Sequence, residues 1–314
     1  MSKKIYDYAI GEDMSLPVLI KTADVRITKT EKRYIAFTFQ DKSGQIDAKF
    51  WGASQDDVQE FQVGKVVWLN GKREVYNNAP QIKIQGLKVV EDVPVDSLIE
   101  RVPISMNDIK NEVNVALCWI EDAIMARIVR HIHKRYEQEF YDFPAAKRHH
   151  HAVTGGLSFH TLSMLRLADA IMNQYPGINR SLLTSGVLLH DIGKVIELSG
   201  SVGTEYTIQG NLIGHIVLMS DEITKTCIEL NIDPTHESVL LLKHVVLSHH
   251  GRLEYGSPVL PRVMEAEILH HIDMLDASIN MISTALEKVG YNEYTDKIYG
   301  LDSRQFYKPK RNIN

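Results

Sequence analysis

A histidine and an aspartate stand side by side at the end of an apolar run, as His190 and Asp191, and Lys194 follows within one helical turn. An imidazole and a carboxylate that are neighbours at a helix end can both turn toward one metal ion. His160 and Asp273 lie on separate segments of helical pattern, upstream and downstream. Side chains from different helices can converge in the core of a bundle, so these residues predict a site for a divalent metal. A set of salt bridges without metal is the alternative, because buried charges need a partner.

Further histidines in the second half of the chain suggest a second ion. His215 follows a glycine in a helical segment, and His249 and His250 end another segment. With Asp191 as a bridge, a second ion could take His215 and one of the two adjacent histidines, and the sequence leaves that choice open. Two ions a few ångströms apart would stabilise both the attacking and the leaving oxygen of a phosphodiester. The alternative is that His215 and His249 only support the first site or the fold.

This interpretation needs no serine or cysteine nucleophile, because a metal-bound water has its pKa lowered toward neutrality and can attack in line. Lys194 can reach a non-bridging phosphate oxygen and offset charge in the transition state. Gly155 and Gly156 precede a helix and leave backbone N–H groups for a phosphate. Arg252, in the loop after the adjacent histidines, is a candidate contact for the next phosphate. A surface lysine and an ordinary helix-start turn are the alternatives for Lys194 and for the glycines.

The composition describes an ordinary globular protein. The chain has 314 residues, 44% hydrophobic and 24% charged, which suggests about two domains. The net charge of −5 argues against a generally basic nucleic-acid binder, so contacts to phosphates must be local. Cys118 and Cys227 lie in apolar helical contexts and predict buried free thiols in a reducing cytosol. Because there is no signal peptide and no apolar run of about 20 residues, we expect a cytoplasmic protein without membrane contact.

Residues 15–92 predict β-structure. Short runs of β-favouring residues alternate with turn signals, at 18–27, 33–40, 45–51, 66–75 and 81–90. A polar piece at 54–61 could be the short helix that plugs a small barrel. Five strands with such an insert predict an OB-fold, a barrel that commonly binds single-stranded nucleic acid.

Alternation assigns the side chains of these strands to two faces. The apolar positions on one face should fill the barrel; they are Ile35, Phe37, Phe39, Ile46, Ala48, Phe50, Ile82 and Ile84. The opposite face interleaves aromatic and cationic side chains, which suit base stacking and phosphate contact. The candidate nucleic-acid contacts are Tyr34, Lys49, Trp51 and Lys83, with Arg73 near a strand end. The alternative is an ordinary exposed face, or one that packs on the next domain.

The hydrophobic period changes after a proline-containing linker at 93–106. Apolar residues then step by threes and fours, with Asn107 or Asp108 as the N-cap of the first helix. Candidate helices cover 107–140, 157–174, 180–191, 209–230, 236–248 and 261–289, of which the first and the last could be broken. We therefore predict a multidomain protein, with an all-β OB-fold barrel at 1–92, the linker, an all-α helical bundle at 107–290 and a C-terminal tail at 291–314.

A resemblance to a known family follows from these motifs. The order of the candidate ligands along the chain resembles that of the HD-domain phosphohydrolase superfamily. These ligands are His160, His190, Asp191, His215, His249 and Asp273. The segments 155–161, 190–194 and 248–258 resemble the YhaM family of bacterial 3′→5′ exoribonucleases, and the likeness runs over residues 5 to about 308. The resemblance implies that the bundle is an HD domain. It also implies manganese-dependent removal of nucleotides from the 3′ ends of single-stranded RNA, with some activity on DNA.

The leading interpretation is a metal-dependent 3′→5′ exoribonuclease of RNA turnover, in which the barrel holds single-stranded RNA and the bundle hydrolyses its 3′ end. We expect two divalent ions: the resemblance implies manganese, while the mixed nitrogen and oxygen ligands also suit iron, cobalt, magnesium or zinc. One alternative is a phosphohydrolase of free nucleotides or cyclic dinucleotides, which would need no strand-tracking barrel. Another is a non-catalytic nucleic-acid-binding regulator, against which the intact ligand set argues. The last helix and the aromatic tail could form a homo-oligomeric interface.

Overall fold

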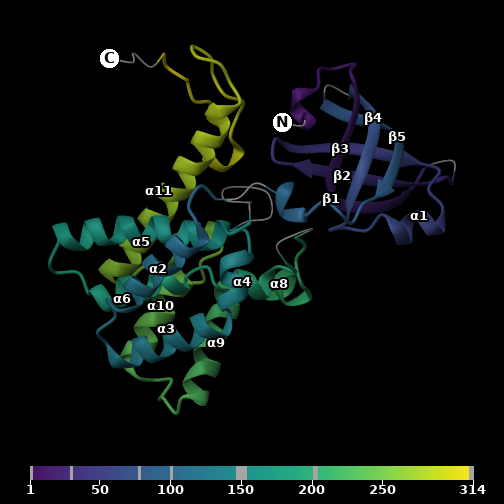
Figure 1. Cartoon of the computed structure of the whole chain (residues 1–314). Helices are drawn as coiled ribbons and strands as arrows, with labels where there is room; N and C mark the ends of the chain where they lie inside the picture. The colour runs from purple at the N-terminus through teal and green to yellow at the C-terminus, as the bar shows by residue number, and fades with distance from the viewer. Residues whose placement is uncertain are drawn as a thin grey trace. The chain divides into compact units, whose positions relative to one another are not determined.

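The computed structural model describes residues 3–28, 31–76, 79–99, 102–145, 154–200 and 204–310. The chain forms two compact units (Figure 1): Met1–Arg101 with Gly200–Thr204, and Val102–Ser199 with Glu205–Asn314. The first unit is built on β-strands and the second on α-helices, which confirms the predicted fold class. Within the described ranges, no helix is long and apolar enough to cross a membrane.

The first unit is a closed five-stranded barrel. Its strands are β1 (Asp13–Ile27), β2 (Arg33–Asp41), β3 (Gly44–Trp51), β4 (Val66–Tyr76) and β5 (Ala79–Val89), with 3₁₀ turns η1 (Ile5–Asp7) and η2 (Val95–Ser97) before and after them. Around the barrel the order is β1-β2-β3-β5-β4, and β4 pairs with β1 to close it. The β3–β5 pair is parallel and the other pairs are antiparallel. Helix α1 (Gln55–Glu60) lies in the connection between β3 and β4, as an OB-fold requires.

The predicted inward face of the barrel is confirmed. The buried side chains on it are Ile35, Phe37, Phe39, Ile46, Ala48 and Ile82. Phe50 and Ile84 pack against this core from partly buried positions. Strand β1 begins at Asp13, earlier than predicted, because its first residues pair with β4. Burying apolar area contributes about 25 cal/mol per Å², so this alternating pattern stabilises one register of the barrel.

Arg73 differs from the prediction that placed it with the nucleic-acid contacts. The β4–β5 pair shifts register just before Gly71, and Arg73 lies opposite Ile82. Directly opposite residues of an antiparallel pair share a face, so Arg73 belongs to the inner face. Its guanidinium donates to the Tyr8 carbonyl, which holds it at one end of the barrel. Lys72 takes the outward position instead.

The second unit is a bundle around helix α6. The helices are α2 (Met106–Leu117), α3 (Ala123–Arg135), α4 (Glu137–Asp142), α5 (Gly156–Gln174), α6 (Arg180–Leu189), α7 (Lys194–Glu197), α8 (Ile208–Ile213), α9 (His215–Glu229), α10 (Glu237–Ser248) and α11 (Met264–Glu287), with 3₁₀ turns η3 (Leu253–Tyr255) and η4 (Tyr299–Leu301). Helix α6 packs against α2, α3, α5, α10 and α11. Every residue from Ser181 to Leu189 is buried, as expected for a helix without a polar face. His190 follows directly as the C-cap.

The predicted helix at 209–230 is two helices. Gly214 has a φ of 79°, which breaks the helical backbone between α8 and α9. Glycine adopts this conformation without a steric cost. His215 is therefore the first residue of α9 rather than a residue inside a longer helix. Because of this break, the backbone N–H of His215 bonds to the side chain of Glu197 instead of to a carbonyl of the preceding turn.

Two smaller predictions are wrong. The N-cap of α2 is Ser105, whose hydroxyl accepts the Asp108 N–H, and neither Asn107 nor Asp108 is the cap. Cys227 is buried as predicted, but Cys118 is exposed. Cys118 is the C-cap of α2, where the chain leaves the buried face of the helix.

Candidate metal centre and nucleic-acid interface

His190 and Asp191 lie where α6 ends and the chain turns tightly. The Lys194 N–H bonds to the Asp191 carbonyl, three residues back rather than the four of an α-helix. The side chains of His190 and Asp191 are both buried. His190 Nδ1 lies 2.8 Å from the Val187 carbonyl. A carbonyl only accepts, so Nδ1 carries the proton and the Nε2 lone pair of His190 is free for a metal.

One carboxylate oxygen of Asp191, Oδ2, faces a first group of ligand atoms. It lies 3.4 Å from His190 Nε2 and 3.9 Å from His160 Nε2. The two Nε2 atoms are 3.4 Å apart, and Asp273 Oδ1 lies 3.2 Å from His160 Nε2. His160, His190 and Asp191 offer ligand atoms that all lie within 4.8 Å of one another. The structure thus brings together the four residues first selected from the sequence.

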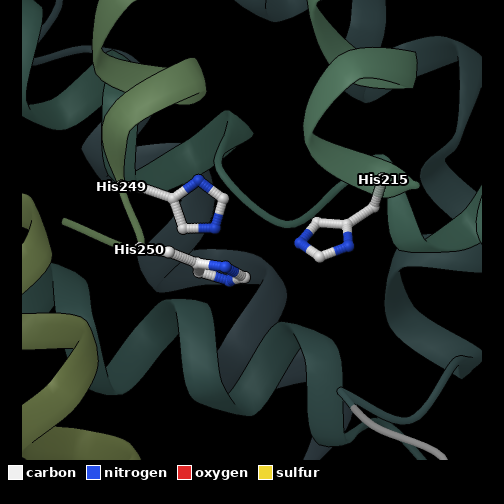
Figure 2. Close-up of side chains that lie close together, drawn as sticks. All are labelled: His215, His249 and His250. Carbon is white, nitrogen blue, oxygen red and sulfur yellow. The ribbon is translucent and has the colours of Figure 1, made fainter. Parts of the chain in front are cut away.

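The other oxygen, Oδ1, faces a second group. His215 Nε2 lies 3.5 Å and His249 Nε2 lies 3.8 Å from Asp191 Oδ1. Figure 2 shows His215 on one helix, facing the adjacent His249 and His250 that follow another. Ligand atoms of these three histidines lie within 4.8 Å of one another. Both members of the adjacent pair are therefore in position, where the sequence had left a choice between them.

Hydrogen bonds fix the orientation of the adjacent histidines. Nδ1 of His249 bonds to the Val246 carbonyl and Nδ1 of His250 to the Tyr255 carbonyl, each at 2.7 Å. Both Nδ1 atoms must donate, which leaves each Nε2 with a lone pair. Metal-binding histidines are commonly held by a bond of this kind on the second ring nitrogen.

Three buried polar atoms of the centre have no hydrogen-bond partner among the described residues: Asp191 Oδ1, His215 Nε2 and His249 Nε2. Such atoms are rare in proteins, because a buried group that lacks its hydrogen bond costs about 1–3 kcal/mol. A cation with nitrogen and oxygen ligands would satisfy all three at once. The side chains present therefore fit a divalent metal.

Burial and neighbouring charges together set the protonation states of Asp191 and His249. Burial alone would raise the pKa of the Asp191 carboxyl, but Lys194 and His190 hold that pKa well below its usual value. Lys194 Nζ lies 2.6 Å from Asp191 Oδ2. Burial lowers the pKa of His249, and the neighbouring His250 and His190 lower it further. At pH 7 Asp191 is an anion and His249 a neutral base, the forms in which each can bind a metal.

Two carboxylates that were not predicted from the sequence support the ligands. Asp276 Oδ2 lies 2.7 Å from His160 Nδ1. Glu197 Oε1 lies 3.1 Å from His215 Nδ1 and also accepts the His215 backbone N–H. Burial lowers the pKa of His160, but its hydrogen bonds to Asp273 and Asp276 outweigh this and raise it to about 9. Asp276 follows Asp273 by one helical turn, so the sequence could have indicated that both carboxylates lie on the same helix face. Glu197 and His215 lie in different helices, and no sequence pattern links them.

Replacing Glu197 with glutamine is expected to weaken metal binding at the second group. The amide keeps the size of the side chain but loses the charge that orients the His215 ring, and changes of this type lower metal affinity about 10–100-fold. Metal titration followed by elemental analysis would measure the loss. Glu287→Gln, at the exposed end of α11, is the matched control. Identical titration curves for wild type and Glu197→Gln would refute the supporting role.

Of the predicted phosphate contacts, Gly155 has surroundings other than those expected. Gly155 has a φ of 77° and its N–H donates to the Asp142 carbonyl, while Gly156 begins α5. Both glycines are buried, so the N–H of Gly155 is not open to a phosphate. The left-handed backbone at Gly155 is instead the reason for a glycine at this position. Arg252 is exposed and lies 5.6 Å from the centre of the Tyr255 ring.

Aromatic and cationic side chains gather on the outside of β2, β3, β4 and β5. The ring centres of Tyr34 and Trp51 are 4.7 Å apart. Lys49 lies 5.7 Å from the centre of the Trp51 ring and 5.2 Å from that of Tyr76. Lys83 is exposed and pairs with Lys49 across the parallel β3–β5 ladder. We call these five residues the outer aromatic face; bases can stack on such rings while the lysines contact phosphates.

Comparison with known proteins identifies a domain in each of the two units. Residues 157–278 match the HD domain model and residues 20–90 that of the OB-fold nucleic acid binding domain. The 3'-5' exoribonuclease YhaM of Listeria monocytogenes is 43% identical over 312 residues, which cover 98% of this chain and 99% of the relative. This chain belongs to the YhaM family. The YhaM proteins of Bacillus pumilus and Geobacillus sp. are 44% and 43% identical, with 99% and 96% of their lengths covered.

Family membership bears on the metal centre. The match to the HD domain in this YhaM-family chain includes α5, α6, α9, α10 and most of α11. All the candidate ligands lie on these helices or in the turns that end α6 and α10. An HD domain implies dependence on a divalent metal, and the histidine and aspartate groups around Asp191 could hold such an ion. The OB-fold model covers the strands that carry the outer aromatic face, consistent with a nucleic-acid substrate.

Proposed function

We propose that the protein is a metal-dependent 3′→5′ exoribonuclease that hydrolyses single-stranded RNA from its 3′ end and acts in RNA turnover. The observation that carries this proposal is the position of Asp191, whose two oxygens face two separate groups of ligands. Sites for two neighbouring ions suit the hydrolysis of a phosphodiester. Relatives that match almost the entire chain are 3'-5' exoribonucleases by name.

Each group would hold one ion, with Asp191 between them. The first ion would take His160, His190, Asp191 and Asp273; the second would take Asp191, His215, His249 and His250. We propose manganese for both, because the mixed nitrogen and oxygen ligands suit it, as they also suit iron and cobalt. When bound, such ions supply an activated water and neutralise charge on the phosphate.

The chain itself supplies orientation and one cation. The histidine rings are held by carbonyl and carboxylate partners before any substrate binds, so little rearrangement is needed during the reaction. Lys194 is largely buried next to Asp191. Its ammonium can donate to a non-bridging oxygen of a phosphate in the centre and offset the charge that develops there.

The outer aromatic face would hold the RNA strand, and Trp51→Ala is expected to weaken that binding. Trp51 is 60% exposed, and loss of a stacked base costs about 1–3 kcal/mol, or roughly 5–150-fold in affinity. Trp68→Ala is the matched control, because Trp68 is also exposed but donates to Ser15 elsewhere on the barrel. Fluorescence anisotropy with labelled RNA would measure both. The melting temperature of both variants should match that of the wild type; equal RNA affinity of the two variants would remove this face from the binding surface.

The reaction itself is tested by its products. RNA labelled at the 5′ end should shorten progressively from the 3′ end in manganese and release mononucleotides. The same protein should leave free nucleotides and cyclic dinucleotides intact. Rapid hydrolysis of a free nucleotide with intact RNA would favour the small-molecule alternative, and RNA binding without turnover in any metal would favour the non-catalytic regulator. Single-stranded DNA in a parallel reaction shows whether DNA is also a substrate.

We further propose the domain limits 1–92 for the OB-fold domain, 93–106 for the linker, 107–290 for the HD domain and 291–314 for the tail, and a cytoplasmic location.

We also propose self-association through α11 and the tail. Helix α11 has no buried side chain after Ile272, although it carries Met274, Leu275 and Ile279 in exposed positions. Clustered exposed apolar side chains are typical of interaction surfaces.

A further inference from the structure

A cavity with a cationic lining lies between α2, α3 and α4 of the helical unit. Its volume is about 160 Å³, and none of its lining residues is a candidate metal ligand. Val113 and Leu117 form an apolar wall. Three cations line it, Lys110, Arg130 and Lys134, against a single acid, Glu137. A concave site with this excess of positive charge favours an anion.

The three cations of this cavity have few fixed partners, although Lys110 also lies 4.8 Å from the centre of the Tyr141 ring. One guanidinium nitrogen of Arg130 donates to the Leu117 carbonyl at 3.2 Å. A guanidinium has five N–H donors, so others remain for a ligand. Lys110 lies 3.5 Å from Glu137 in a contact between exposed side chains, which stabilises little. Lys134 makes no hydrogen bond or ion pair within the part of the chain that the structure describes. An anion in the cavity would therefore gain donors without breaking a buried network.

The floor of the cavity is connected to the turn that carries the metal ligands. His133 lines the cavity and is buried, and its Nε2 lies 3.0 Å from the Leu188 carbonyl. In a continuing helix that carbonyl would pair with Ile192, but the Ile192 N–H bonds to Leu189 instead. His133 thus satisfies a carbonyl that the end of α6 leaves without a helical partner. An occupant of the cavity would contact the residue that holds the backbone two positions before His190.

We propose that the cavity lined by Lys110, Arg130, His133 and Lys134 binds a phosphate group, separate from the metal centre. Planar guanidinium and mobile ammonium groups together suit phosphate oxygens, which accept several hydrogen bonds. The size of the cavity fits one phosphate with part of its substituent, and the apolar wall suits a nucleoside. The phosphate belongs either to a free mononucleotide or to the backbone of an RNA strand. The proposal does not depend on the nuclease activity.

The test measures binding in a chelator, so that metal ions do not contribute. The probes are adenosine monophosphate, adenosine as the phosphate-free counterpart, and a short RNA oligonucleotide. The variant is Arg130→Gln with Lys134→Gln. The control is Lys225→Gln with Lys297→Gln, which makes the same charge change at exposed positions of the same unit. Calorimetry gives each affinity.

The expected result is that wild type and control bind the mononucleotide better than adenosine, and that the variant binds it at least about tenfold more weakly. A loss confined to the oligonucleotide would support the same phosphate site with RNA backbone as its source. Unchanged affinity of the variant for both probes overturns the proposal. If the double variant melts early, Lys134→Gln alone decides, because this side chain has no partner within the described residues to lose; unchanged affinities in that variant also overturn it.

Discussion

Replacing Asp191 with asparagine is expected to abolish hydrolysis of RNA and to empty both metal positions. The substitution keeps the shape of the side chain, but it removes the charge and leaves a single oxygen where two now face the two ligand groups. Loss of one preorganised electrostatic contact costs about 10²–10³ in rate, and Asp191 would serve two ions, so we expect a loss of at least about 10³-fold. Single-turnover hydrolysis of labelled RNA and elemental analysis would measure rate and metal content.

His215→Ala separates the two positions. Of the two Asp191 oxygens, His215 Nε2 pairs with Oδ1, so one ion should remain in this variant where none remains in Asp191→Asn. Asp169→Asn is the matched control for charge, because Asp169 pairs with Arg180 on the surface of α5 and should retain both ions and full activity. Equal metal loss in the Asp191 and His215 variants would rule out Asp191 as a bridge.

Gly193→Ala is expected to destabilise the helical unit and to displace His215. The φ of Gly193 is −54°, ordinary for any residue, so the effect would be purely steric. An added Cβ would lie 2.2 Å from the His215 carbonyl oxygen, and a backbone atom cannot rotate away as a side chain can. Overpacking of this kind costs about 1–3 kcal/mol, occasionally more. Calorimetry should therefore show a melting temperature lower by roughly 2–12 °C, with weaker binding of the second ion and reduced turnover.

Gly177→Ala is the control for the change of residue type. No atom lies within 4 Å of a Cβ added at Gly177, so its effect on the free energy of unfolding should stay within about 0.5 kcal/mol. The Gly193→Ala variant could instead have the melting temperature of the wild type and keep both ions. That result would show that the contact between the turn after α6 and the start of α9 does not constrain the site.

The fold class followed from the sequence because each unit repeats a local pattern. In the barrel, alternation alone placed Ile35, Phe37 and Phe39 inside, since a side chain on the wrong face would lose its burial. In the bundle, the three- and four-residue steps located the buried helices. The candidate ligands could be selected for the same reason: a histidine or carboxylate on an apolar helix face needs a partner.

The arrangement of the ligands was decided by the tertiary structure. The sequence suggested Asp191 as a bridge, but only packing of α5, α9, α10 and α11 around α6 turns its two oxygens toward different groups. The supporting role of Glu197 depends on the break at Gly214, which exposes the His215 N–H to it. Strand pairing likewise places Arg73 opposite the inward-facing Ile82 rather than on the outer face.

The sequence by itself determined which residues could do chemistry and on which type of element they lie. Periodicity is a property of neighbouring positions, so it is legible without a structure. Whether His250 joins His249, which oxygen of Asp191 faces which histidine, and which carboxylate holds His215 all depend on contacts between segments far apart in the chain. Those contacts arise from the packing of whole helices against one another, and a one-residue break or shift changes them.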